Sequence, residues 1–577
     1  MSDTIRSRLA ALRDRMRLHG IDAYRIGTAD DHASEYVAPH FQTRAWFSGF
    51  TGSAGTLLVT TDSADLWTDG RYFLQAESQL AGSAIRLRRQ GEEGTPTIAR
   101  YLAETLPDGA VIGTDGKTTS VGELQALRDA LAEKNFRFDV QHDLAQVLWR
   151  DRPPMPQSTL FSIYSGELRS EKLVRIRAAM DSGADSLLIS SLEEIAWTLN
   201  LRGHDVRYTP VFYAYLLIGR RDAVLFTDSI IPEDIRLSLA QDGVRVLPYA
   251  DVAGYCRTLS APLVCDRSVN AALYSALPRS TVLCSHTPIR RMKAIKNETE
   301  QQNERIAHLW DGLAVTRLIF RLKTDGKQRT ECSLCRELEE LRKLAPSYEM
   351  PSFGTIAAFG EHGAVIHYEP DEKSDAPLTE GLLLLDTGGQ YEEGTTDLTR
   401  TVVLGTATDR QKRHYTAVLR GNLAVSAASF GVDEGGSGLD ALARAPIRAE
   451  GLDYAHGTGH GVGYRLAVHE SPPGLRKTDG AALEAGMIVS DEPGIYLEGQ
   501  YGIRLENLLL CRNSGDRRTF EILSLVPFDR DAIEPSLMTR DELRTLNAYH
   551  ETVFKALSPY LEDDVKAWLK AATAPIF

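Results

Sequence analysis

The chain has 577 residues and a formal net charge of −14. Its length exceeds what one hydrophobic core holds and predicts roughly three or four domains. Its acidic balance argues against a nucleic-acid-binding surface, because such a surface concentrates lysine and arginine. No segment approaches the ~20 consecutive apolar residues of a transmembrane helix, and the N-terminus lacks an apolar signal segment. We therefore expect a cytoplasmic protein with neither nucleic-acid nor membrane partners.

The N-terminal region alternates predicted helices and strands. Arginine and leucine recur at helical spacing over residues 3–19, and residues 23–26 favour a strand. A glycine-rich turn leads into residues 55–60 and 64–69, which predict a hairpin. The adjacent prolines of residues 152–157 are incompatible with a helix and with a central strand, so they predict a linker.

The same pattern recurs after this linker. Residues 183–189 resemble residues 20–26, and residues 223–228 resemble residues 64–69 at a nearly equal offset. Two similar α/β domains are the simplest explanation, and chance similarity between short strands is the alternative. We assign the two domains to residues 1–152 and 158–288.

A third region begins near residue 289 and continues to the end of the sequence. Asn297 and Glu300 have the spacing of a capping box, which predicts a helix that runs to about Leu322. Residues 536–577 are again predicted to be helical. Short strands and helices alternate between them, and this part of the chain carries the residues on which the functional prediction depends.

The six cysteines do not predict a disulfide framework or a redox site. None precedes Cys256, and they are too few and too unevenly placed for structural disulfides. Cys332 and Cys335 have CxxC spacing, but they fall in a helical pattern without the preceding strand of a redox motif. We interpret both as ordinary helix residues.

Five residues of the third region lie in unusual local settings, namely Asp386, Asp397, His460, Glu492 and Glu506. Asp386 ends a run of four leucines, and a buried carboxylate is costly unless it is paired or bound to a metal. Glycines surround His460, which makes a helix implausible there and indicates close backbone approach to a ligand. Each residue also has an ordinary explanation, as a turn or a solvent-facing side chain. Together the set suits two divalent cations and predicts a dinuclear hydrolase.

The ordered motifs of this region resemble those of the pita-bread metallopeptidases, and within them those of the long, three-domain form of aminopeptidase P (Xaa-Pro aminopeptidase). The similar segments are residues 363–368, 385–388, 395–400, 456–464, 468–470, 491–494 and 502–507. Segments of the first two regions are similar to that form as well, at residues 47–55, 67–72 and 194–203. The sequence departs from the family at Ser471, where glycine is common, and over residues 464–467.

The resemblance implies a fold of class α/β (α+β), in which two similar N-terminal α/β domains precede a pita-bread catalytic domain at residues 289–577. It implies two divalent metal ions, with manganese as the usual metal and zinc or cobalt as alternatives. It also implies a homodimer. The implied ligands are Asp386, Asp397, His460, Glu492 and Glu506, of which His460 and Glu492 bind one metal, Glu506 bridges, and Asp397 contributes little to bridging.

The implied activity is that of a metallo-aminopeptidase that hydrolyses the N-terminal Xaa-Pro bond of peptides with proline at the second position. Two cations about 3.5–4 Å apart hold a bridging hydroxide at neutral pH and polarise the scissile carbonyl. Glu492 is the candidate that accepts the proton of this nucleophile and passes it to the leaving nitrogen. His367 and His469 resemble histidines that stabilise the tetrahedral intermediate and line the proline side. The other predicted substrate-pocket residues are His456, Tyr496 and Arg504.

Two alternative functions remain open at this point. A prolidase-type Xaa-Pro dipeptidase has the same metal centre, but two similar domains ahead of the catalytic one argue against it. A non-catalytic pita-bread module that binds peptides or partners is disfavoured because all five predicted ligands are present. The same ligands disfavour creatinase-like amidine hydrolysis.

Overall fold

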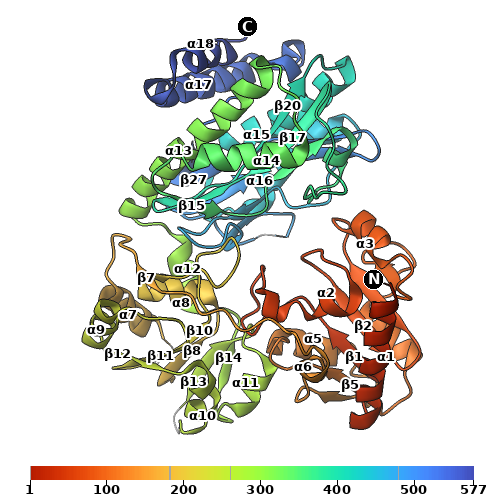
Figure 1. Cartoon of the computed structure of the whole chain (residues 1–577). Coiled ribbons are helices and arrows are strands. Elements are labelled where there is room, and N and C mark those ends of the chain that lie inside the picture. Colours follow the sequence, from red (N-terminus) through yellow and green to blue (C-terminus); the bar gives the residue numbers. More distant parts are fainter. Residues whose placement is uncertain (1, 181–182, 260–261, 479) are drawn as a thin grey trace. The chain divides into compact units, whose positions relative to one another are not determined.

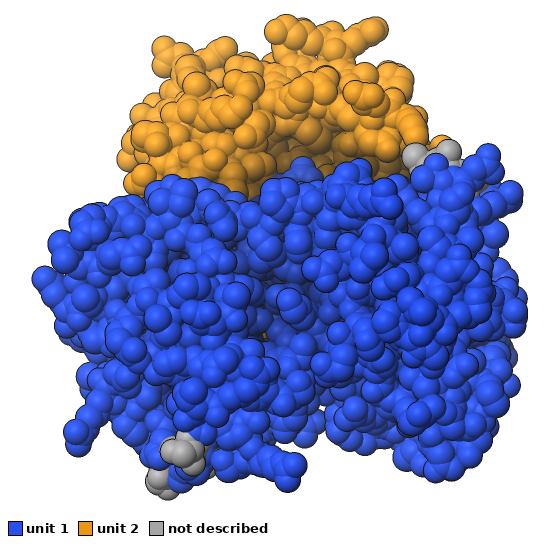
Figure 2. All heavy atoms as spheres, turned by 60° about the horizontal axis from the view of Figure 1, so that its bottom comes forward, with its two compact units in different colours: residues 1–289 blue, residues 290–577 orange. Residues whose placement is uncertain are grey.

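The computed structural model describes residues 2–180, 183–259, 262–478 and 480–577. The chain forms two compact units, Met1–Ile289 and Arg290–Phe577 (Figure 2). Among the described residues, no helix combines the length and the apolar composition that crossing a membrane requires.

The first unit contains two six-stranded mixed sheets (Figure 1). The first sheet has the spatial order β4 (Arg86–Arg89), β3 (Ala64–Thr68), β2 (Thr56–Thr60), β1 (Ala23–Ile26), β5 (Val111–Thr114), β6 (Arg137–Asp139). Its helices are α1 (Ser2–His19), α2 (Thr43–Ser48), α3 (Phe73–Leu80), α4 (Ile98–Thr105), α5 (Val121–Ala130) and α6 (Leu144–Leu148). Strands β2 and β3 pair as the predicted hairpin, and α1 confirms the predicted N-terminal helix.

The second sheet repeats the first in order and in strand direction. Its spatial order is β12 (Val244–Leu247), β11 (Ala223–Thr227), β10 (Ala214–Gly219), β8 (Ser186–Ile189), β13 (Leu263–Asp266), β14 (Val282–Cys284). The accompanying elements are β7 (Phe161–Ser162), β9 (Leu201–Arg202), α7 (Arg169–Ala179), α8 (Leu192–Leu199), α9 (Glu233–Gln241), α10 (Val252–Arg257) and α11 (Ala271–Ala276). In both sheets a central strand pairs antiparallel with one neighbour and parallel with the other.

The sequence similarity between the two halves of this unit has a structural counterpart. Strand β8 takes the place of β1, and β11 takes the place of β3. These are the two pairs of segments whose sequences match. Because short strands that resembled one another by chance would have no reason to occupy equivalent sheet positions, the prediction of two similar α/β folds is confirmed.

The second unit is built from several small sheets with helices packed against them. The sheets are β15 (Tyr348–Pro351), β18 (Gly389–Tyr391), β19 (Gly394–Thr395); β16 (Ile356–Phe359), β17 (Gly381–Thr387), β20 (Leu398–Leu404); β21 (Phe430–Gly431), β28 (Arg517–Ile522), β27 (Asn507–Ser514), β24 (Ile488–Asp491), β22 (Gly459–Gly461), β23 (Glu470–Leu475); and β25 (Gly494–Leu497), β26 (Tyr501–Arg504). The helices are α12 (Pro288–Ala294, which begins in the first unit), α13 (Glu298–Thr324), α14 (Glu331–Arg342), α15 (Asp409–Ser426), α16 (Gly436–Ala449), α17 (Arg540–Leu557) and α18 (Asp563–Ala572).

The predicted helical segments of this unit are present. Asn297 caps α13 through a capping box with Glu300, and the helix ends at Thr324, close to the expected residue. Cys332 and Cys335 lie in α14 as free thiols, as their helical interpretation required. Helices α17 and α18 account for the predicted helical tail.

Two hydrophobic cores join the sheets of the second unit to its helices. Apolar side chains of α13 and α14 pack on one face of the β16–β17–β20 sheet, around Val315, Leu338 and Leu383. A second cluster joins α15 and α17 to β25 and β26, around Leu419, Ile503 and Leu546. Burial of a large aliphatic side chain contributes roughly 1.5–3 kcal/mol, so these two clusters hold the strands that carry the polar site.

Candidate active site

The first two predicted ligands come from one antiparallel hairpin. Asp386 lies near the end of β17 and is paired with Thr399 of β20, and Thr387 is paired with Leu398. Asp397 directly precedes β20, so the return of the chain through β18 and β19 brings it back beside the end of β17. Both carboxyl groups are buried.

His460 and Glu492 are brought together by close packing between β22 and β24. A Cβ atom on Gly459 would lie 1.8 Å from the carbonyl oxygen of Ser490, so only glycine permits this approach. The amide of His460 donates to the Ser490 hydroxyl at 3.0 Å, and the amide of Glu492 donates to the Thr458 carbonyl at 2.8 Å. The glycine-rich sequence around His460 is therefore a backbone requirement of the site.

Glu506 lies in a break between two strands. The sequence pattern predicts one continuous alternating strand here, but β26 ends at Arg504 and β27 begins at Asn507. The buried Glu506 accepts a hydrogen bond from the Thr399 hydroxyl at 2.7 Å. Thr399 was missed by sequence reasoning, although its position two residues after Asp397 places both on the same face of the chain.

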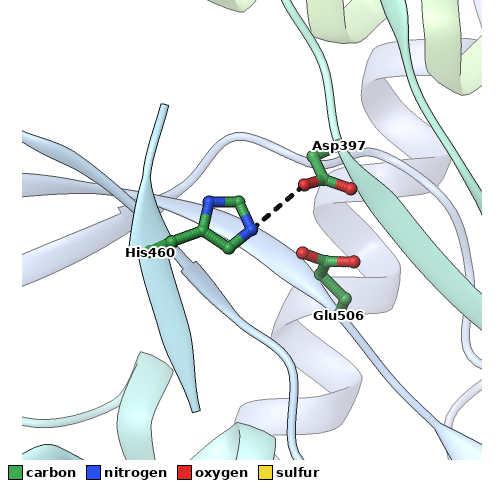
Figure 3. A group of neighbouring side chains, drawn as sticks. All are labelled: Asp397, His460 and Glu506. Atoms are coloured by element: carbon green, nitrogen blue, oxygen red, sulfur yellow. Dashed lines mark ion pairs between the residues drawn. The ribbon is translucent and has the colours of Figure 1, made fainter. Parts of the chain in front are cut away.

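Three of the five predicted ligands converge in the structure (Figure 3). One ligand atom from each of Asp397, His460 and Glu506 lies within 4.8 Å of the other two. Glu492 adjoins this group, since its Oε1 lies 3.5 Å from Nε2 of His460. Asp386 is held differently, because its Oδ2 accepts from Nη2 of Arg504 at 2.6 Å.

The orientation of the His460 ring fits a cation. Its Nδ1 donates to the Gly461 carbonyl at 2.9 Å, so in the neutral ring Nε2 carries a lone pair. That lone pair faces Oδ2 of Asp397 at 3.4 Å and Oε1 of Glu492 at 3.5 Å, which are acceptors as well. Acceptors that face one another need a cation or a proton between them.

The electrostatics of the carboxyl groups give the same indication. Burial raises the pKa of Glu492 to about 7, and the nearby Asp397 and Asp386 add to this shift against the opposing effects of His460 and Arg504. Burial also raises the pKa of Asp386 and holds the pKa of Glu506 well above its ordinary value. Oδ1 of Asp386 and Oε1 of Glu506 have no hydrogen-bond partner among the described residues. Divalent ions supply the missing positive charge, so the donor set fits a metal centre.

A hydrogen-bonded chain extends from Asp386 to His456. Arg504 donates through Nη2 to Asp386 and through Nη1 to the Tyr496 hydroxyl, the latter at 2.8 Å. Nδ1 of His456 donates to the Gly457 carbonyl, so its Nε2 accepts from the Tyr496 hydroxyl at 2.8 Å. Burial and the Arg504 charge lower the pKa of His456 to about 3, which keeps its ring neutral. Tyr496, Arg504 and His456 therefore act as one unit beside the carboxyl groups.

Four segments of the chain match known protein families. Residues 302–513 match metallopeptidase family M24, and residues 518–576 match the C-terminal region of that family. Residues 8–147 and residues 151–300 each match the creatinase/prolidase N-terminal domain. The probable Xaa-Pro aminopeptidase P of Laccaria bicolor is 37% identical over 99% of this chain and 93% of its own length. This chain belongs to metallopeptidase family M24.

Solved structures of M24 metallopeptidases show where the similarity extends. The X-prolyl aminopeptidase of Caenorhabditis elegans, described as a cytosolic enzyme with a di-nuclear active site, matches with a TM-score of 0.95 and 31% identity. It covers 99% of this chain and 100% of its own. The prolidase of Pyrococcus horikoshii is 25% identical with a TM-score of 0.51, and its nearly complete length covers 62% of this chain. This M24 metallopeptidase therefore has the aminopeptidase P architecture over its whole length.

The remaining predicted residues of this M24 metallopeptidase lie around the carboxyl cluster. The ring of His469 is exposed and meets the ring of His460 edge-on, with 4.4 Å between centroids. His367 follows the short helix η3 (Gly360–Ala364) and is half-buried. The backbone of Gly363 approaches Gly502 so closely that a Cβ there has no space, and Arg504 contacts the Ile366 carbonyl at 3.4 Å. The loop that carries His367 is thus packed against β26, next to Arg504.

Proposed function

We propose that this M24 metallopeptidase removes the first residue of peptides whose second residue is proline. The observation that carries the proposal is the lone pair of His460, which faces the carboxylates of Asp397 and Glu492 beside Glu506 in a chain whose full-length relatives are Xaa-Pro aminopeptidases. The chain is a metal-dependent aminopeptidase of that type, and the roles of its individual residues are proposals.

The metal would be held by the five buried or half-buried groups of the site, Asp386, Asp397, His460, Glu492 and Glu506. Two divalent ions bound there activate water and polarise the scissile carbonyl. A set of four carboxylates and one imidazole suits manganese, and zinc and cobalt are the alternative metals for the same donors. Oδ1 of Asp386 and Oε1 of Glu506 have no hydrogen-bond partner among the described residues, which leaves them available as metal ligands.

Glu492 is the proposed proton carrier. Its carboxyl group lies beside His460 and the other carboxyl groups of the site, within reach of a water molecule bound there. The Ser490 hydroxyl contacts Oε1 of Glu492 at 3.3 Å and fixes the side chain beside His460. From this position Glu492 takes a proton from the attacking water and delivers it to the proline nitrogen, which has no hydrogen of its own as an amide.

Two histidines are proposed to bind the substrate. His469 presents an exposed ring beside His460, where it reaches the oxygen that develops negative charge during hydrolysis. His367 lies on the loop beside Arg504 and lines the proline side. The Arg504, Tyr496 and His456 chain keeps the Asp386 carboxylate in place from behind.

A peptide-length series separates this function from its alternative. An aminopeptidase cleaves Xaa-Pro-Xaa tripeptides and longer peptides, whereas a prolidase-type enzyme cleaves only Xaa-Pro dipeptides. The assay is run on metal-free protein restored in turn with manganese, zinc and cobalt, with metal content measured for each sample. Cleavage confined to dipeptides would contradict the proposal, and so would activity unaffected by removal of metal. A binding scaffold would cleave neither class.

Several further predictions remain proposals with direct tests. We propose three domains, at residues 1–152, 158–288 and 289–577. Limited proteolysis tests this division, because cleavage is expected first at residues 152–157 and near residue 289. We propose a homodimer, for which sedimentation at several concentrations gives the mass. A cytoplasmic location is proposed from the absence of a membrane-crossing helix among the described residues and from the cytosolic nematode enzyme.

A further inference from the structure

Glu470 is a buried carboxylate that the proposed reaction does not use. Its side chain is 1% exposed and forms ion pairs with two lysines, Lys293 near the end of α12 and Lys296 three residues later. Oε1 lies 2.7 Å from Nζ of Lys296, and Oε2 contacts Nζ of Lys293. The side chains of these lysines are 7% and 0% exposed. Burial of two ammonium groups beside a single carboxylate costs free energy, and other contributions to the fold must offset this cost.

Two other carboxyl groups of this neighbourhood, Glu300 and Glu304, are also buried. Glu304 of α13 lies close enough to Lys296 and Glu470 to interact electrostatically with both. Burial holds the pKa of Glu304 well above its ordinary value. Glu470 is the carboxylate that forms ion pairs with both lysines.

The position of Glu470 in the sheet connects this charge cluster to the candidate active site. It is the first residue of β23 and lies directly opposite Gly461, the residue after His460. His469 immediately precedes it, with an exposed ring beside the ring of His460. Glu470 is buried against the two lysines, whereas the exposed ring of His469 lies against the ring of His460. Arg290 adds a further contact, from Nε to the Ser471 carbonyl at 2.6 Å.

We propose that Glu470, held by Lys293 and Lys296, is a positioning residue that fixes the His469 ring beside His460 for the reaction. The segment from Arg290 to Lys296 thus anchors the chain at Glu470 and Ser471, directly after His469. Loss of the carboxylate releases this anchor and lets the His469 ring move out of reach of the developing charge. This inference rests on the role of His469 in the proposed function.

The test is a double-mutant cycle between Glu470→Gln and His469→Ala, measured on the full chain with an Xaa-Pro-Xaa tripeptide. Glu470→Gln alone is expected to lower kcat about tenfold or more, as substitutions behind an active-site histidine commonly do. KM and metal content are expected to remain near the wild-type values, because the ligand His460 keeps its own contacts to Gly461 and Ser490. In the His469→Ala background, Glu470→Gln is expected to change kcat by less than about twofold, since the residue through which it acts is absent.

Control variants separate positioning from folding. Lys296→Met keeps the Lys293 pair and should give a smaller loss of kcat that also disappears in the His469→Ala background. Arg291→Met removes a neighbouring cation whose partner is Glu484, and kcat should not change. Equal losses of kcat in both backgrounds, or a loss of metal content in Glu470→Gln, would overturn the proposal while leaving the peptidase function intact. If wild-type protein cleaves no Xaa-Pro peptide, both proposals are wrong.

Discussion

Buried carboxyl groups are treated differently in the first sheet and in the candidate active site. In the first sheet Asp65 lies between two arginines, with Nε of Arg86 and Nε of Arg88 each 2.9 Å from its Oδ1. Its second oxygen accepts hydrogen bonds from the hydroxyl groups of Ser63 and Tyr101. Every oxygen lone pair that faces the protein therefore has a donor, and the group is a structural anion.

The site leaves its carboxyl groups incompletely paired. Four of them, Asp386, Asp397, Glu492 and Glu506, share one imidazole and one guanidinium group, and two of their oxygens have no hydrogen-bond partner among the described residues. Carboxyl groups are buried in both places, so burial by itself does not mark a functional site. The missing positive charge does, because metal ions are the group that completes such a set. The predictions below test this distinction, from the largest expected effect to the smallest.

Glu492→Gln tests the incompletely paired side of the comparison most strongly. The amide keeps the size of the side chain but cannot carry the proton, so kcat is expected to fall by about 10²–10⁴-fold. Steady-state kinetics on a tripeptide, with metal content measured in parallel, gives the result. Glu498→Gln is the matched control, since Glu498 is exposed six residues away and should behave as wild type. Retention of kcat within tenfold would show that another group carries the proton.

Arg504→Lys tests whether the guanidinium group that pairs with Asp386 also needs its second partner, Tyr496. Lysine keeps the charge but lacks the planar guanidinium group that donates to Asp386 and to the Tyr496 hydroxyl at the same time. We therefore expect kcat/KM to fall about 10–100-fold. Tyr496→Phe removes only the second bond and should cost less. Arg512→Lys, at an exposed ion pair of β27, is the control. A loss in the Arg512 variant equal to that in Arg504 would remove the basis of this prediction.

Asp65→Asn tests the fully paired side. The variant leaves Arg86 and Arg88 without their carboxylate, and we expect a fall of about 1–3 kcal/mol in the free energy of unfolding. The arginines reach solvent, with 58% of the Arg86 side chain exposed, which limits the cost. The activity of the folded fraction should not change. Asp62 is an exposed neighbour, so Asp62→Asn should alter neither stability nor activity. A change of kcat in Asp65→Asn would contradict the purely structural role of this carboxyl group.

Asp31 provides a case outside the site in which a buried carboxyl group has few partners. It accepts a hydrogen bond from the Tyr249 hydroxyl at 3.1 Å, and burial followed by the charge of Asp115 raises its pKa to about 7. Because the folded pKa exceeds the unfolded one, the folded state binds the proton more tightly, and this group makes stability fall as pH rises from about 4 to 7. Asp31→Asn should remove this dependence and become more stable than wild type above pH 7, by on the order of 1 kcal/mol. Thermal unfolding of both proteins at several pH values measures it, and parallel curves would contradict the expectation.

The sequence predicted the elements better than the contacts between them. The capping box of Asn297, the hairpin of β2 and β3 and the repeated strand patterns are local signals, since each depends on residues a few positions apart. The separation between β26 and β27 was not predicted, because the alternating pattern of residues 503–508 continues through a break in pairing. Local periodicity records which face a side chain prefers, and it carries no information about which strand lies opposite.

The candidate site likewise contains residues that the sequence indicated and contacts that only the structure revealed. The sequence alone indicated Asp386, Asp397, His460, Glu492 and Glu506, because carboxylates and a histidine in apolar or glycine-rich settings are costly without a ligand. Only the tertiary structure decided that Arg504 pairs with Asp386, that Thr399 donates to Glu506, and that two lysines hold Glu470 behind His469. These partners lie more than 100 residues apart in the chain, so no local pattern records them, and their choice depends on how the sheets of the second unit pack together.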